Sequence, residues 1–159
     1  PLWGSPMCLY QAIAAAAISK IRDFTIRDLS NLAWSFATLG FRDEPLLEAL
    51  AWAVVSQVHE DDHCTPQHFS NIAWSFAGLR MRNDELFEAL ADAAIAMMAD
   101  FRPQNIANMA GAYAKLSVTH EPLMAALAEQ AISTISQFSP QDLASFSWAL
   151  ARLGLRDDE

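Results

Sequence analysis

Hydrophobic residues recur along this chain at the spacing of one helix face, in blocks that resemble one another. In one block, Leu29, Leu32, Ala33, Phe36 and Leu39 follow a period of 3.6 residues. This period is typical of an amphipathic helix that buries one side. A second apolar period follows after a short polar turn, so each block predicts a pair of helices.

The same helix pattern occurs four times. Residues 29–39 and 69–79 are almost identical, and looser copies follow at 106–116 and 143–153. Equivalent positions are 40, 37 and 37 residues apart, a step that is typical of solenoids built from helical hairpins. The sequence therefore predicts an all-α fold, an α-solenoid of tandem antiparallel helix hairpins with 37–40 residues per repeat. Such an array buries its apolar faces between neighbouring repeats.

Capping signals place the start of each repeat. Thr25 and Asp28 resemble a capping box, in which a hydroxyl and a carboxylate satisfy backbone N–H groups. Proline at the first helical position marks the other starts, at Thr65–Pro66, Ser139–Pro140 and, without a capping side chain, Arg102–Pro103. We divide one solenoid domain, residues 1–159, into a partial repeat, three complete repeats and a second partial repeat: 1–24, 25–64, 65–101, 102–138 and 139–159. Because both ends fall inside a repeat, we interpret the sequence as part of a longer chain.

Composition and charge narrow the classes of function. The chain is 53% hydrophobic, yet no apolar run approaches the ~20 residues of a membrane-spanning helix, so we expect no membrane span. The net charge of −9 argues against an extended phosphate-binding surface, because affinity for nucleic acid comes largely from Lys and Arg. However, most acids fall at the starts of the second helices, in turns and in an insertion at 59–64. A locally neutral or basic face on an acidic body is therefore compatible with the composition.

Two recurring motifs carry a family resemblance. Residues 31–39 read Asn-Leu-Ala-Trp-Ser-Phe-Ala-Thr-Leu, and residues 43–50 read Asp-Glu-Pro-Leu-Leu-Glu-Ala-Leu. Together with the repeat length, they resemble the heptatricopeptide and octotricopeptide repeat families over about residues 14–159, although the octotricopeptide Pro-Pro-Pro-Glu-Trp signature is absent. The third copy departs from the motif, with Gly111 in place of the tryptophan and Tyr113 in place of the phenylalanine. The resemblance implies an organellar protein, mitochondrial or plastid, associated with RNA binding, transcript processing and translation.

A polar stripe along the first helix of each repeat is the candidate contact face. Positions 27, 31, 34 and 38 line up at i, i+4, i+7 and i+11, opposite the apolar stripe. Amides on such a face can reach base edges, and tryptophans can stack on bases. The candidate RNA-binding residues on this stripe are Arg27, Asn31, Trp34, Gln67, Asn71, Trp74, Gln104, Asn108, Lys115, Gln141, Trp148 and Arg152.

A structural role for the same residues remains open. Tryptophans at a fixed repeat position often fill the seam between adjacent hairpins, which would apply to Trp34, Trp74 and Trp148. Repeated asparagines often bond to neighbouring backbone groups and so hold a stack together, which would apply to Asn31, Asn71 and Asn108.

Catalytic and metal-binding chemistry has little support. The insertion His59–Cys64 and the nearby His68 gather metal-binding residue types, but a zinc site needs four firmly placed ligands. We interpret the insertion as a solvated loop and expect no metal and no cofactor. The histidines have no recognisable nucleophile partner, and the carboxylates recur with the repeat rather than as one pair. We therefore expect no enzymatic activity and no small-molecule substrate.

Two functions fit these observations. The first is a non-catalytic binding module for single-stranded RNA in organellar gene expression, with the polar stripe as its contact face. The alternative is an acidic scaffold or accessory subunit that binds proteins of a large organellar assembly, such as a ribosome or a photosynthetic or respiratory complex. The resemblance favours the first, and the shortage of Lys and Arg favours the second.

Overall fold

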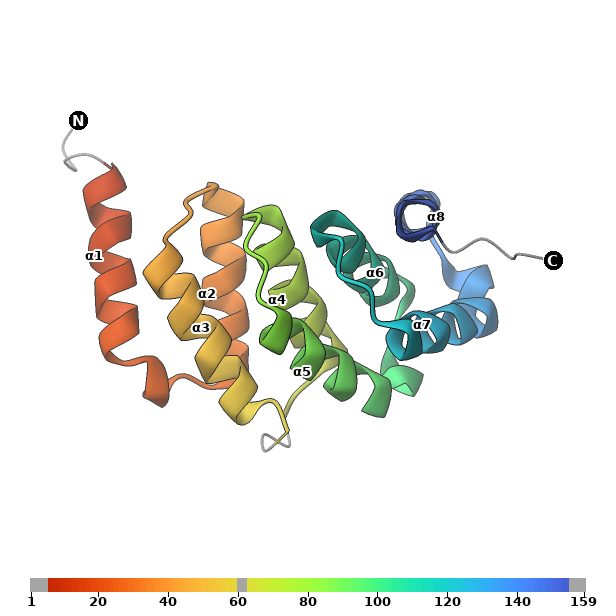
Figure 1. Cartoon of the computed structure of the whole chain (residues 1–159), viewed down its shortest axis with the longest axis horizontal. Coiled ribbons are helices and arrows are strands. Elements are labelled where there is room, and N and C mark those ends of the chain that lie inside the picture. Colours follow the sequence, from red (N-terminus) through yellow and green to blue (C-terminus); the bar gives the residue numbers. More distant parts are fainter. Residues whose placement is uncertain (1–5, 60–62, 155–159) are drawn as a thin grey trace.

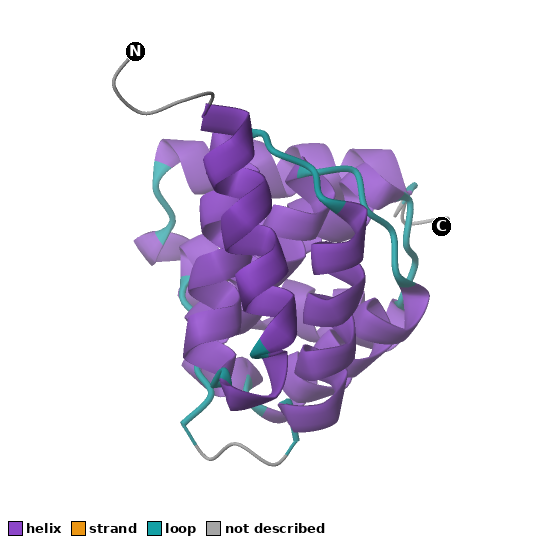
Figure 2. Cartoon of the chain, turned by 90° about the vertical axis from the view of Figure 1, so that its left-hand side faces the viewer, coloured by secondary structure: helices purple, strands orange, loops and turns teal. Residues whose placement is uncertain are grey.

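The computed structural model describes residues 6–59 and 63–154. Within these residues every regular element is a helix and no strand occurs (Figure 2). The α-helices are α1 (Pro6–Ser19), α2 (Ile26–Leu39), α3 (Glu44–Gln57), α4 (Pro66–Gly78), α5 (Asp84–Ala96), α6 (Pro103–Leu116), α7 (Glu121–Thr134) and α8 (Pro140–Leu153). Short 3₁₀ helices follow α1, α5 and α7, at Ile21–Asp23, Met98–Asp100 and Ile135–Gln137. The predicted all-α fold is confirmed.

The helices alternate between two layers along the stack (Figure 1). Helices α2, α4, α6 and α8 lie side by side in extensive contact, and we call them the inner layer. Helices α1, α3, α5 and α7 form the outer layer, in which neighbours contact each other much less. Small residues allow the close approach, since a Cβ added at Gly78 of α4 would lie only 3.9 Å from the Cβ of Ala37 in α2.

The apolar core lies between the two layers and extends along the stack, rather than gathering at one centre. Both layers contribute to it, with the leucines of the outer layer and the phenylalanines of the inner layer among the residues that are fully buried. Examples are Leu50 of α3, Phe76 of α4, Leu90 of α5 and Leu127 of α7. Because each repeat seals against the next, stability depends on the contacts between neighbouring repeats.

Two of the inner-layer helices, α2 and α8, begin with complete capping boxes. Thr25 Oγ1 accepts a hydrogen bond from the N–H of Asp28 over 3.3 Å, and the Asp28 carboxylate accepts one from the N–H of Thr25 over 3.1 Å. The hydrogen bond from the Thr25 side chain is the main reason why the pKa of Asp28 lies below its ordinary value. Ser139 and Asp142 repeat the arrangement at the start of α8. The capping box predicted at Thr25 is therefore confirmed.

The inner-layer helices also end in a common way. A residue in the left-handed conformation follows each helix, with φ between 54° and 70°. These residues are Gly40, Arg80, Ser117 and Gly154. Their spacing reproduces the 40, 37 and 37 residues of the sequence repeat. Glycine adopts this conformation without cost, so Arg80 and Ser117 hold a less favourable backbone angle that the repeat geometry imposes.

The outer-layer helices use three different residues for the same cap. Asp43 and Asn83 accept hydrogen bonds from the N–H groups of Leu46 and Leu86, over 2.9 and 2.8 Å. At the start of α7, His120 takes this place, and its Nδ1 accepts from the N–H of Leu123 over 3.1 Å. None of the helices in the described part of the chain is long and apolar enough to cross a membrane.

A buried asparagine joins two repeats. Asn105 lies near the start of α6 and is only 4% exposed. Its Nδ2 donates to Gln67 Oε1 over 3.1 Å and to Ser70 Oγ over 3.2 Å, both in α4. Its Oδ1 accepts from the N–H of Arg102 over 3.1 Å, which restores half of the capping box that this helix was expected to lack.

Replacing Asn105 with alanine is expected to lower the free energy of unfolding by about 1–3 kcal/mol, because the buried Ser70 hydroxyl in α4 and the backbone N–H of Arg102 at the start of α6 each lose a hydrogen-bond partner. Urea unfolding followed by circular dichroism would measure the change. Asn108→Ala is the matched control, since the Asn108 side chain has no hydrogen-bond partner among the described residues. Equal losses in the two variants would contradict a specific role for Asn105 in joining the repeats.

Candidate nucleic-acid interface

The residues of the polar stripe all lie on the surface of the inner layer. Asn71 and Asn108 are half-buried, and the others are exposed. Helix α2 carries Arg27, Asn31 and Trp34, α4 carries Gln67, Asn71 and Trp74, α6 carries Gln104, Asn108 and Lys115, and α8 carries Gln141, Trp148 and Arg152. Because the four helices lie side by side, the stripe runs across the stack from repeat to repeat. We call this surface the inner face.

The tryptophans of the stripe do not fill the seam between hairpins. Trp34, Trp74 and Trp148 are 47%, 40% and 49% exposed. A buried aromatic residue lies two positions after Trp34 and Trp74, at Phe36 and Phe76, and after Gly111, at Tyr113, whereas in α8 it lies two positions before Trp148, at Phe146. Two residues correspond to a rotation of about 200° around a helix, so one aromatic points into the core and the other points out. The seam interpretation of the tryptophans is therefore wrong.

The asparagines of the stripe do not hold the repeats together. Asn71 accepts a hydrogen bond from Gln67 of its own helix over 2.6 Å. In the described part of the chain, the side chains of Asn31 and Asn108 make no hydrogen bond. The bonding role belongs to Asn105, which sequence reasoning missed. In the sequence, the only sign of this role is that Asn105 occupies the third position of its helix. The capping aspartates Asp28 and Asp142 occupy the same position in α2 and α8.

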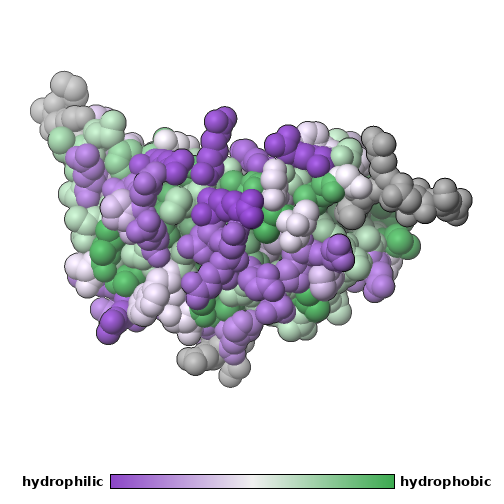
Figure 3. All heavy atoms as spheres, viewed as in Figure 1, coloured by the Kyte–Doolittle hydropathy of each residue, from purple (hydrophilic) through white to green (hydrophobic). Residues whose placement is uncertain are grey.

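Charge is divided between the two layers. Helices α3, α5 and α7 contain no Lys or Arg but eight carboxylates: Glu44, Glu48, Asp84, Glu85, Glu88, Asp92, Glu121 and Glu129. The inner-layer helices contain Arg27, Lys115 and Arg152, and their two carboxylates are the capping Asp28 and Asp142. Hydrophilic side chains accordingly cover much of the surface over α3 and α5 (Figure 3). The negative net charge of the chain therefore comes mainly from the outer layer and not from the inner face.

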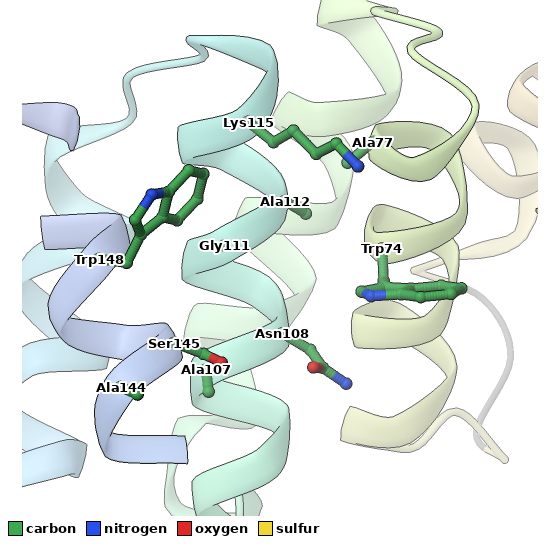
Figure 4. A pocket seen from close by; sticks show the side chains of 10 residues that line it. All are labelled: Trp74, Ala77, Ala107, Asn108, Gly111, Ala112, Lys115, Ala144, Ser145 and Trp148. Atoms are coloured by element: carbon green, nitrogen blue, oxygen red, sulfur yellow. The ribbon is translucent and has the colours of Figure 1, made fainter. Parts of the chain in front are cut away.

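The cations of the inner face differ in how firmly they are held. Arg152 donates from Nε to the carbonyl oxygen of Ala114 at the end of α6, over 2.9 Å. Its guanidinium carbon also lies 5.5 Å from the centre of the Trp148 ring. Lys115 has no hydrogen-bond or ion-pair partner among the described residues, and its side chain extends across the surface toward Ala77 of α4 (Figure 4). Lys115 is therefore available to a ligand, whereas Arg152 partly serves the fold.

Hollows lie between the inner-layer helices. One, of about 720 Å³, lies where α2 and α4 begin, and Arg27 and Asn31 line it. Another, of about 230 Å³, lies where α6 and α8 begin, and Asn108 and Gln141 line it. A third, of about 420 Å³, lies over the middle of α6 at Gly111. The inner face is therefore an uneven surface with recesses along the stripe.

The structure also brings together a histidine and two carboxylates in the outer layer. One atom each from Glu88, Asp92 and His120 lie within 4.8 Å of one another. His120 Nε2 is 3.6 Å from Glu88 Oε1, and its Nδ1 is already used as the cap of α7. Nearby, burial raises the pKa of the Tyr113 hydroxyl far above its ordinary value, and that hydroxyl donates to the carbonyl of Phe87. These contacts serve packing and capping between α5, α6 and α7.

The insertion is only partly described. Residues 60–62, which contribute three carboxylates to the metal-binding residue types of the insertion, lie outside the described residues. Cys64 is buried and lies next to the end of α3, with its Sγ 4.0 Å from the carbonyl oxygen of Val58.

The repeating hairpins and the stripe across their inner layer define the chain as a helical-repeat protein. Residues 9–159 match the family model of the RNA-editing substrate-binding complex 6 protein, and the chain belongs to that family. A comparison with curated proteins finds no significant match. The family supports an RNA-associated helical protein, which is the broad part of the resemblance found in the sequence. It does not single out the heptatricopeptide or octotricopeptide families.

Proposed function

We propose that this chain is a non-catalytic module that binds single-stranded RNA along its inner face, as part of an RNA-processing assembly in the mitochondrion. The observation that carries the proposal is the division of charge: the inner-layer helices combine exposed tryptophans and amides with three cations and only the capping carboxylates Asp28 and Asp142, whereas α3, α5 and α7 carry eight carboxylates and no Lys or Arg. The description of the family names a complex that binds the substrates of RNA editing. Complexes of this kind are mitochondrial in kinetoplastids, which favours the mitochondrion over the plastid.

Stacking rather than phosphate neutralisation would supply most of the affinity. A stacked base contributes about 1–3 kcal/mol, and three exposed tryptophans lie along the face. Each phosphate neutralised on a single strand contributes about −0.7 to the slope of log K against log salt concentration. Two or three cations therefore predict a slope of about −1.4 to −2.1. This shallow dependence is a signature that separates the inner face from a strongly basic RNA-binding surface.

A salt titration tests the proposal. Binding of a fluorescently labelled 20-nucleotide single-stranded RNA would be measured by anisotropy between 50 and 400 mM KCl. We expect a slope of about −1.4 to −2.1, which Lys115→Ala makes shallower by about 0.7. Arg22→Ala is the matched control, because Arg22 stacks on Trp52 of α3, 5.4 Å from the ring centre, and lies away from the inner face. Absence of binding at the lowest salt concentration would refute the proposal.

A second function, protein binding by the outer layer, is favoured by two observations. The outer-layer helices α3, α5 and α7 carry eight carboxylates and no Lys or Arg. Ile132 and Ile135, at the end of α7 and just after it, are 75% and 52% exposed. Such a surface suits a basic partner protein with an apolar contact. Purification from native organelles would test it, since recovery of free monomer alone would count against a stable partner.

A further inference from the structure

We propose that the hollow over Gly111 receives one nucleobase of the bound strand. This inference rests on the proposed function and adds to it a specific base-binding site. We call this hollow the Gly111 pocket. It has a volume of about 420 Å³, and its lining includes Trp74, Asn108, Gly111, Lys115, Ser145 and Trp148.

The pocket exists because one repeat lacks its tryptophan. The position of Gly111 corresponds to Trp34, Trp74 and Trp148 in the other repeats. A Cβ built on Gly111 would meet nothing within 4 Å, so the space is open from the backbone outward. The tryptophans of the two neighbouring helices remain in place on either side (Figure 4). The absence of one indole therefore leaves a recess between two others.

The lining of the pocket matches the chemistry of a base. Trp74 and Trp148 line it from α4 and α8, so two indoles on which a base can stack lie beside the space. The Asn108 amide provides both donors and an acceptor for a base edge, and the Ser145 hydroxyl can do either. Because the Asn108 side chain makes no hydrogen bond within the described residues, its full bonding capacity is available.

A cation at the rim favours RNA over a peptide. Lys115 lines the pocket and has no ion-pair partner in the described part of the chain, and no carboxylate lines the pocket. A phosphate next to an inserted base would provide the negative charge with which the Lys115 ammonium group can pair. An apolar protein side chain could occupy the space, but it would use neither the amide nor the ammonium group. The observations therefore favour a base with its adjoining phosphate.

Two substitutions at one position test the pocket. Gly111→Leu fills the space without adding an aromatic face, and Gly111→Ala is the matched control that adds one methyl group and leaves the space open. Both residues favour a helix more than glycine does, so neither variant is expected to unfold, and thermal unfolding by circular dichroism would verify this. The probes are a 12-nucleotide single-stranded RNA, measured by anisotropy, and the four nucleoside 5′-monophosphates, measured by quenching of tryptophan fluorescence.

We expect Gly111→Leu to weaken RNA binding about 10-fold, which lies within the range of one lost base stack, and to reduce quenching by the monophosphates. Gly111→Ala should stay within twofold of the parent in both measurements. Undiminished RNA affinity in Gly111→Leu would overturn the pocket while the proposed RNA-binding function stands. If the parent chain binds no RNA, both proposals fail. Loss of a partner protein without loss of RNA affinity in Gly111→Leu would assign the pocket to a protein side chain and overturn the assignment to a base.

Discussion

Replacing Trp34, Trp74 and Trp148 together with alanine is expected to reduce the affinity for single-stranded RNA by at least about 100-fold. Each indole is between 40% and 49% exposed on the inner face, and loss of one base stack costs about 1–3 kcal/mol. The three losses are not strictly additive, so 100-fold is the lower bound that we adopt. The fold should persist, because the three side chains lie outside the core. Anisotropy titration with a 20-nucleotide RNA measures the affinity.

The chain supplies a matched control for this experiment. Trp52 is 52% exposed, like the tryptophans of the stripe, but it belongs to α3 in the outer layer. Trp52→Ala therefore removes an equally exposed indole from the other side of the solenoid and should leave RNA affinity unchanged. If Trp52→Ala weakens binding as much as the triple substitution does, the inner face is not the binding surface. Unchanged affinity in the triple variant would lead to the same conclusion.

The architecture was accessible from the sequence because its causes are local and repeated. Each helix shows its own 3.6-residue period, and the capping box at Thr25 involves residues only three positions apart. A solenoid also places sequence neighbours next to each other in space, so no long-range pairing has to be guessed. Four copies of one pattern supply the same evidence four times, which is why the all-α prediction is confirmed.

The orientation of the tryptophans was not accessible in the same way. The 3.6-residue period places Phe36 on the apolar stripe and Trp34 opposite it, but the size and hydrophobicity of the indole also suit a buried position between hairpins. In the structure the phenylalanine is 3% exposed and the tryptophan 47%. The preference of tryptophan for buried seams therefore gave the wrong interpretation.

Contacts between repeats were also beyond the sequence. Asn105 reaches Gln67 across 38 positions, and this contact depends on how far one helix is displaced along its neighbour. The Gly111 pocket depends on the same geometry, because its walls come from three helices. In the sequence Gly111 is only a departure from the repeat, and its meaning appears when the neighbouring tryptophans are seen beside it. The candidate RNA-binding residues themselves stay a prediction until binding is measured.

Phe76→Ala is expected to lower the free energy of unfolding by about 3–5 kcal/mol, the usual cost of removing a buried phenylalanine side chain. Phe76 has 0% exposure and lies in α4, in the middle of the stack. Its helix contacts both α2 and α6 in the inner layer, so a cavity there weakens two interfaces between repeats. Urea unfolding, with circular dichroism and tryptophan fluorescence compared at each concentration, would measure the loss.

Trp74→Ala is the control that gives this result its meaning. It removes a larger aromatic side chain only two residues away in the same helix, but from a position that is 40% exposed. We expect a cost below about 1 kcal/mol, in the range of substitutions away from the core. Phe76→Ala should in turn impair RNA binding only at urea concentrations where the variant unfolds. If Trp74→Ala destabilises the chain as much as Phe76→Ala does, the tryptophans hold the solenoid together, and the surface proposed for RNA is structural instead.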